Sequence, residues 1–346
     1  MSRNYPNNAS CSKLILLLKY VYMKIKNKLM CLSCLLVLLT GCSSLNNSKE
    51  YSLDRYKLTM NYKSDFKIMQ LTDLHFSVQT DYVKVKTYLA KNITTSNPDL
   101  MVLTGDTFMD ATKNIVTNVL DFVDSFNIPF AITFGNHDQQ GDYDYDFVTN
   151  YIKSKKNAMY LDYEDDNLTG LANYFIDLMD NGTVKYRLYI LDSNSYYFNG
   201  IKYDYDIIHD EQLEHIENIN KTDGDAFGLV FYHIPLYEET DAYALFKEGK
   251  IVGKGENREK SCVAYKRSDA FNRMKNASIK AHFFGHDHIN YTDLMYQGVS
   301  LSYGLKSTPE IYSDDDLLGY KEITLKDDMS WDINTNIVTR FVEYEK

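Results

Sequence analysis

The sequence predicts an α/β protein in which a parallel β-sheet is followed by strands of antiparallel type. Strand and helix patterns alternate between residues 66 and 134, a hairpin signal lies at residues 180–182, and strand patterns dominate the C-terminal part. The chain has 346 residues, of which 44% are hydrophobic and 25% are charged. This composition is typical of a globular protein with one large domain and a full core.

The first half of the folded region consists of alternating strands and helices. Short apolar runs predict the strands, and apolar residues at helical spacing predict the helices. In order, we expect a strand at 66–71, a helix at 82–95, a strand at 100–103, a helix at 111–127, a strand at 129–134 and a helix at 144–156. The β-α-β-α-β order implies parallel strands joined by right-handed crossovers.

A second sheet is expected to begin at a hairpin. Asp180-Asn181-Gly182 is a strong turn signal between strand patterns at 174–178 and 186–191. The remaining expected elements are a helix at 209–218, a strand at 227–232, an insertion-like stretch at 237–261, a helix at 265–276, and strands at 281–284, 294–303, 321–325 and 337–344. The last strands follow one another without helices, which favours antiparallel pairing.

The N-terminus has the layout of a bacterial export signal. Six basic and no acidic residues precede residue 42, and an apolar run at 29–40 is too short to span a bilayer. The stretch Leu39-Thr-Gly-Cys42 resembles the bacterial lipobox, in which the cysteine becomes the lipidated first residue. The alternative is a hydrophobic helix of a cytosolic protein, and translation from either Met1 or Met23 fits the pattern.

This N-terminal pattern divides the chain into three parts. We expect a lipoprotein signal peptide at 1–41, a flexible polar tether at 42–62 and a single folded domain at 63–346. Lipidation of Cys42 would place the domain outside the cytoplasm, anchored to the cell membrane. Only Cys262 would then remain as a free cysteine of the mature chain, so no intramolecular disulfide is expected.

The charge of the chain argues against one class of partner. The formal net charge is −11, and loss of the basic signal peptide would leave a still more acidic protein. A protein that binds nucleic acid through its phosphates needs a basic surface. A nucleic acid polymer is therefore not an expected partner.

Five short polar motifs each follow directly after an apolar strand, where an open α/β sheet presents its ligand-binding loops. They contain residue types that bind transition metals through oxygen or imidazole nitrogen. The candidate ligands are Asp73, His75, Asp106, Asn136, His233, His286 and His288. Because one ion takes three or four such ligands, seven of them indicate two adjacent ions that share one carboxylate. Such a pair binds phosphate and lowers the pKa of bound water enough to form hydroxide near neutral pH.

The ordered pattern D-x-H, G-D, G-N-H-D, H and G-H-x-H closely resembles the calcineurin-like metallophosphoesterase superfamily over about residues 66–305. Flanking residues, as in Gly135-Asn-His-Asp-Gln139, look most like its purple-acid-phosphatase-like branch. The resemblance implies a four-layer α-β-β-α sandwich of two mixed sheets. It also implies a phosphatase: a hydrolase of phosphate esters whose partner is a small phosphorylated substrate.

The resemblance also implies a role for each site residue. The roles are Asp73, His75 and His288 on a first metal, Asn136, His233 and His286 on a second, Asp106 between them, His137 as the acid that contacts the phosphate, and Asp138 as the residue that orients His137. Purple enzymes have tyrosine where this chain has Met109, and they lack the equivalent of His75. We therefore expect a pair of divalent or mixed-valence Fe, Mn or Zn ions without a tyrosinate ligand.

Several alternatives stay open at this point. The substrate could be a phosphodiester or pyrophosphate of a nucleotide or lipid head group, and a non-catalytic lipoprotein that binds metal or phosphate would use the same ligands. Among other residues, His209, His215 and His282 are expected to be structural, and Asp110 is expected to cap a helix. Asn290 could touch the substrate, and a tyrosine near the site, such as Tyr232 or Tyr303, could stack on an aryl or nucleoside group, but the sequence does not choose among the tyrosines.

Overall fold

The computed structural model describes residues 55–162 and 167–338. By its contacts the chain divides into two units, Met1–Ser52 and Leu53–Lys346, and the account below concerns the second. The expected signal peptide, Cys42 and the beginning of the tether lie outside the described residues. Among the described helices, none has the length and apolar character needed to cross a bilayer.

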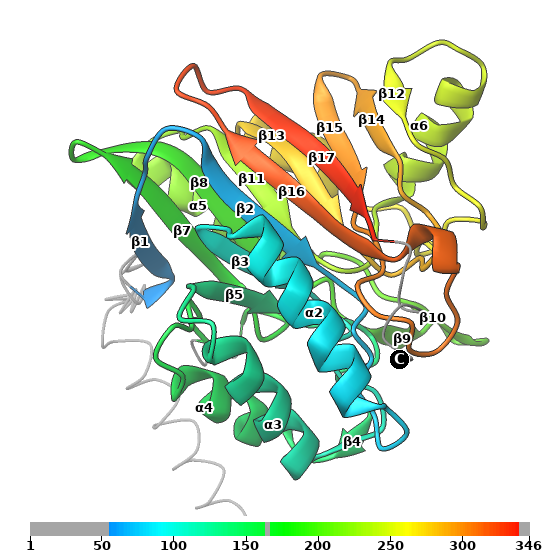
Figure 1. Cartoon of the computed structure of the whole chain (residues 1–346). Coiled ribbons are helices and arrows are strands. Elements are labelled where there is room, and N and C mark those ends of the chain that lie inside the picture. Colours follow the sequence, from blue (N-terminus) through cyan, green and yellow to red (C-terminus); the bar gives the residue numbers. More distant parts are fainter. Residues whose placement is uncertain (1–54, 163–166, 339–346) are drawn as a thin grey trace, which may run out of the picture. The chain divides into compact units, whose positions relative to one another are not determined.

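Two mixed sheets form the centre of this unit (Figure 1). In spatial order, the larger sheet contains β1 (Lys57–Asn61), β7 (Asn173–Asp180), β8 (Thr183–Leu191), β11 (Gly228–Phe231), β13 (Ile279–Phe284), β15 (Val299–Tyr303), β14 (Asp293–Tyr296) and β12 (Gly253–Lys254). The smaller contains β17 (Trp331–Ile337), β16 (Gly319–Leu325), β2 (Phe66–Leu71), β3 (Leu100–Thr104) and β5 (Phe130–Thr133). Two short ribbons pair β4 (Ala111–Thr112) with β6 (Gly141–Asp142) and β9 (Tyr196–Phe198) with β10 (Tyr203–Tyr205).

Both sheets contain a run of parallel strands, as the β-α-β pattern predicted for the smaller one. Strands β2, β3 and β5 are parallel, and so are β8, β11, β13 and β15. The hairpin of β7 and β8 turns at Asn181-Gly182, and both residues have the positive φ that this turn requires. Strand β16 pairs antiparallel with β2, and β17 pairs antiparallel with β16.

Helices cover both sheets and complete four layers. The smaller sheet is covered by α2 (Tyr82–Ser96), α3 (Lys113–Asp124) and α4 (Tyr145–Lys153). On the outer side of the larger sheet lie α5 (Asp210–Asp223) and α7 (Ala270–Asn276). Helix α6 (Tyr237–Lys247) packs beside β14 of the larger sheet. One hydrophobic core contains residues of both sheets, such as Ile132 and Phe231. The four-layer α-β-β-α sandwich of two mixed sheets is thus the observed fold.

Helix α3 illustrates how local sequence places these layers. Its buried residues Ile115, Val119 and Val123 repeat every four positions and face the core. The side chain of Thr112 accepts a hydrogen bond from the Ile115 N–H and caps the helix. The prediction that Asp110 caps this helix is wrong, because Asp110 lies in a left-handed turn (φ 48°) before β4.

Three elements differ from the sequence-based expectation. Strand β1 lies within the stretch 42–62 expected as a tether, so the folded part includes at least Tyr56, which is buried. Helix α6 occupies the expected insertion. Strand β17 runs over Trp331–Ile337, whereas the strand expected at 337–344 lies mostly outside the described residues.

Candidate metal centre

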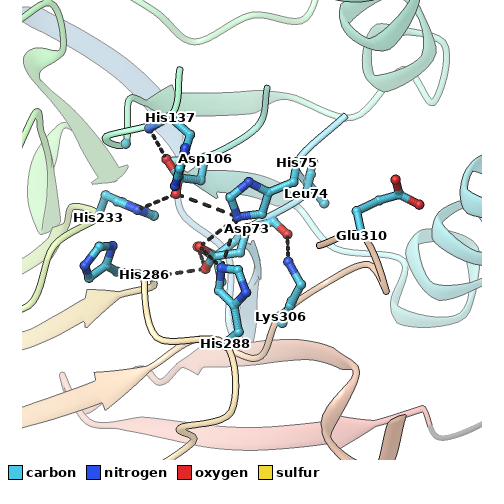
Figure 2. A network of polar contacts seen from close by, with 12 residues as sticks. Asp73, Leu74, His75, Asp106, His137, His233, His286, His288, Lys306 and Glu310 are labelled. Atoms are coloured by element: carbon cyan, nitrogen blue, oxygen red, sulfur yellow. Dashed lines mark hydrogen bonds and ion pairs between the residues drawn. The ribbon is translucent and has the colours of Figure 1, made fainter. Parts of the chain in front are cut away.

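The candidate ligands come together where the parallel strands of both sheets end (Figure 2). The smaller sheet supplies four of them from the loops after β2, β3 and β5, and the larger sheet supplies three from the loops after β11 and β13. In order, they are Asp73, His75, Asp106, Asn136, His233, His286 and His288. All seven side chains are buried, none exposing more than 8% of its surface.

Backbone conformations at these loops are unusual. Asp73, His75, Asp106 and His286 all have positive φ, between 48° and 81°, which costs free energy for residues other than glycine. Backbone hydrogen bonds hold the loops in place, for example from His75 N to Asp106 O at 2.9 Å. At Gly285 there is no room for a side chain, since a Cβ atom would lie 2.0 Å from the Thr72 hydroxyl. The glycine before His286 is therefore required by close packing.

Asp73, His75 and His288 form a first donor cluster. The two histidine Nε2 atoms are 3.0 Å apart, and Asp73 Oδ1 lies 3.7 Å from the first and 3.5 Å from the second. Ligand atoms about 2.1 Å from one ion are roughly 3.0–3.4 Å apart at octahedral or tetrahedral angles. The separations in this cluster are therefore close to those of ligands that share an ion.

Asp106, His233 and His286 form a second cluster. Asp106 Oδ2 lies 3.1 Å from His233 Nε2 and 3.7 Å from His75 Nε2, so this carboxylate faces both clusters. Figure 2 shows it between the rings of His233 and His75. The position suits a carboxylate that bridges two sites.

The unpaired atoms of the centre fit metal ions. Asp73 Oδ1, Asn136 Oδ1 and His286 Nε2 are buried without any hydrogen-bond partner, although burial of an unsatisfied acceptor is costly. His233 and His288 each have Nδ1 within 2.9 Å of a backbone carbonyl, so in a neutral ring this nitrogen donates and the lone pair lies on Nε2. Lone pairs without donors, converging in two groups, are what two cations would satisfy.

Electrostatics within the centre favours neutral imidazoles at two positions. Burial and the charge of Lys306 lower the pKa of His75 to about 4, and burial lowers the pKa of His286 to about 3. Burial opposes charge on His233 too, but the Asp106 carboxylate outweighs it and raises the pKa of His233 to about 10. Metal binding at the second cluster would therefore displace a proton from His233.

Comparison with known proteins identifies the family. Residues 66–290 match the family model described as calcineurin-like phosphoesterase, which is more than half of the chain. The chain belongs to this family. The matched region contains all six donors of the two clusters and also Asn136.

Individual relatives share about a quarter of their residues with this chain. Two Arabidopsis thaliana proteins named "Probable inactive purple acid phosphatase" 14 and 29 are 26% and 27% identical to the chain. The alignments cover 76% and 72% of this chain and 75% and 74% of the relatives. A crystal structure of a dimetal phosphatase from Danio rerio shares the fold, with a TM-score of 0.50, 12% identity, and coverage of 77% of this chain and 94% of that one.

His137 lies beside the first cluster but belongs to neither donor cluster. Its backbone N–H donates to Asp106 Oδ1 at 2.7 Å, and its ring centroid is 5.2 Å from that of His75. Its ring Nδ1 lies 2.8 Å from Gln140 Oε1, so Nδ1 carries the proton that is donated and Nε2 is left for another partner. A histidine placed in this way can transfer a proton to a group bound at the ions.

The role expected of Asp138 is corrected. The ring of His137 is oriented by Gln140, because the Asp138 carboxylate is turned toward the backbone. It accepts hydrogen bonds from the N–H groups of Asp106, Phe108 and Gly135, at 2.7–2.9 Å. Burial and the neighbouring Asp106 charge raise its pKa to about 7. Asp138 therefore joins the loops after β3 and β5 and shapes the centre indirectly.

Three tyrosines at the centre have no signal in the sequence. Tyr196 Oη accepts a hydrogen bond from Asn136 Nδ2 at 2.9 Å. The ring of Tyr205 meets His286 edge-on with centroids 4.5 Å apart, and Tyr312 stacks on His288 at 4.2 Å. The tyrosines expected to stack on a substrate, Tyr232 and Tyr303, are fully buried under the loops and do not serve this purpose.

The remaining polar residues have structural environments. His209 precedes α5 with its ring 3.0 Å from Asp206, His215 faces the carbonyl of Asn173, and His282 is buried against Tyr232. Asn290, expected near the substrate, is buried, and its Oδ1 accepts from the Glu259 N–H. It supports the loop after β13.

Proposed function

We propose that this chain hydrolyses small phosphate esters with two transition-metal ions, divalent or mixed-valence Fe, Mn or Zn. The observation that carries the proposal is the pair of buried donor clusters that share Asp106, with His137 next to them but outside both. A protein that only stores metal has no use for a histidine held beside the ligands.

Each part of the centre has a task in this proposal. The ions, when bound, would hold the phosphate and lower the pKa of water to make the attacking hydroxide. Asp73, Asn136 and the Nε2 atoms of His75, His233, His286 and His288 would hold the ions, with Asp106 between them. His137 would contact the phosphate and, as an imidazolium, give its Nε2 proton to the leaving oxygen while Gln140 accepts a hydrogen bond from Nδ1.

A non-catalytic binding protein is the second candidate, since the named Arabidopsis relatives carry the word "inactive". Against it stands the complete donor set of this chain, together with His137. Within the enzyme proposal, a monoester is our first choice of substrate, and diesters or pyrophosphates of nucleotides or lipid head groups are the alternatives. A panel of these compounds with the metal-loaded protein would choose among them.

The His137→Ala variant tests the proposal. It should keep both ions yet lose about 10²–10⁴ in turnover of an alkyl phosphate, the usual range for a positioned proton donor. The loss should shrink for nitrophenyl phosphate, whose leaving oxygen needs no proton. The His209→Ala variant is the matched control, because His209 precedes α5 and its ring contacts Asp206, which is not a residue of the centre. Equal turnover of wild type and His137→Ala on the alkyl ester, with both metals bound, would contradict the acid role.

We propose separately that the protein is a membrane-anchored lipoprotein, from the lipobox-like stretch before Cys42. Replacement Cys42→Ser should move the protein from the membrane fraction to the soluble fraction. A wild-type protein that is already soluble, with its N-terminus intact, would exclude the anchor.

A further inference from the structure

Tyrosine rings border the centre next to two of its outermost ligands. His286 and His288 both come from the loop after β13, and each is covered by a tyrosine from another segment. Tyr205 of the β9–β10 ribbon lies against His286, and Tyr312 of the segment before β16 lies against His288. We call Tyr196, Tyr205 and Tyr312 the tyrosine ledge.

The ledge is held firmly but is not covered. Tyr196 and Tyr205 stack on each other with centroids 5.3 Å apart, and Tyr196 is also bound to Asn136. The Tyr312 hydroxyl donates to the Glu259 carboxylate at 3.1 Å. Even so, Tyr196 and Tyr312 expose 42% and 49% of their surfaces. Exposed aromatic rings that are fixed in place lose little entropy when they bind a ligand.

The three rings lie beside one short loop of the centre. Tyr205 and Tyr312 contact His286 and His288, the two residues that flank Asp287 in the sequence. Tyr196 joins them through its stacking on Tyr205. A group attached to a phosphate at the ions would lie next to this loop.

We propose that the tyrosine ledge binds a planar aromatic group of the substrate, such as an aryl ring or a nucleobase. The inference rests on the proposed function, because it assumes that the phosphate lies at the ions. Planar rings stack on tyrosine faces in offset or edge-on arrangements and gain free energy beyond their buried area. A saturated ring of the same size gains the buried area alone.

Binding of inert phosphonates to the metal-loaded full chain tests the ledge without any need for turnover. Methyl-, cyclohexyl- and phenylphosphonate would be compared by calorimetry, and a nucleoside phosphonate would distinguish a nucleobase from a simple aryl group. We expect phenylphosphonate to bind about 3- to 10-fold more tightly than cyclohexylphosphonate. Replacements Tyr205→Leu and Tyr312→Leu should each reduce this preference, whereas Tyr312→Phe should keep it.

Tyr151→Leu is the matched control, since Tyr151 is a tyrosine of α4 that stacks on Phe147 of the same helix. It should leave the preference unchanged. Equal binding of the phenyl and cyclohexyl compounds, or a preference that survives both leucine variants, would overturn the ledge and leave the proposed function standing. If no phosphonate binds, including the methyl compound, both the ledge and the phosphate centre are wrong.

Discussion

Two regions of the molecule that bury charged groups treat them in opposite ways. In the larger sheet, Arg187 is fully buried and forms a bidentate ion pair with Asp177, at 2.7 and 3.1 Å. It also contacts Asp223, Asn220 and the carbonyl of Gly224. Every nitrogen of its guanidinium group therefore has an acceptor.

The metal centre is equally buried but has the opposite arrangement. Its acceptors face one another, and Asp73 Oδ1, Asn136 Oδ1 and His286 Nε2 have no donor at all. Protein interiors rarely leave such groups unsatisfied. The comparison shows that a complete network stabilises the fold by itself, whereas an incomplete one indicates where a ligand belongs.

Replacing the shared carboxylate should have the largest effect. Asp106→Asn removes the charge between the clusters, and we expect metal affinity to fall by more than about 100-fold, above the effect of outer hydrogen-bond partners. Metal content after dialysis and turnover with excess metal would measure this. Added metal should restore part of the activity of Asp106→Asn but none of that of His137→Ala. A variant that keeps two ions per chain would contradict the bridging role.

Breaking the complete network should affect stability and not metal binding. Arg187→Ala leaves Asp177 buried, and loss of one partner of a buried pair costs about 3–5 kcal/mol of unfolding free energy. We expect urea unfolding to show a loss of about 3 kcal/mol in unfolding free energy, the lower end of this range, because Lys57 lies 3.3 Å from Asp177 and still compensates part of its charge.

A matched control lies on the same strand. Lys185→Ala removes a surface pair with Asp180 and should cost under about 1 kcal/mol. Loss of metal from folded Arg187→Ala would show that the two regions are not independent.

The smallest expected effect concerns one hydroxyl. Tyr196→Phe removes the acceptor that fixes the amide of Asn136, an expected metal ligand, and such partners contribute about 10- to 100-fold in metal affinity. Metal titration of the protein would measure the change. Tyr203→Phe on the same ribbon is the control, because Tyr203 is exposed and should have no effect. Equal metal affinity of Tyr196→Phe and wild type would show that the amide needs no support.

The residues of the two donor clusters could be predicted from the sequence because they depend on local features. Each motif follows a strand whose apolar pattern is clear, and the carboxyl ends of parallel strands meet at one edge of a sheet. Asp106 and His233 therefore belong to one site although they are far apart in the chain. The order of strands along each sheet and the tilt of side chains are not local, and the sequence did not specify them.

The failures have the same explanation. Tyr196 and Tyr312 reach the centre from segments without a motif, and only the packed structure brings them to Asn136 and His288. Asp138 was expected to orient the adjacent His137, but in the structure its carboxylate accepts hydrogen bonds from backbone N–H groups. Strand β17 is partly exposed on most of its length, so its apolar alternation is weak.

The attachment of the Asp73 loop to the segment after β15 has a consequence for the order of folding. Lys306 Nζ donates to the carbonyl of Asp73, Thr308 donates to that of Leu74, and β2 is flanked by β16. These contacts join residues more than 200 positions apart, and such distant pairings form late and slowly. A growing chain would already contain Asp73, His75 and Asp106 without being able to hold them in register. Metal uptake should therefore be one of the last events of maturation, reserved for chains that have been completed to their C-terminal strands.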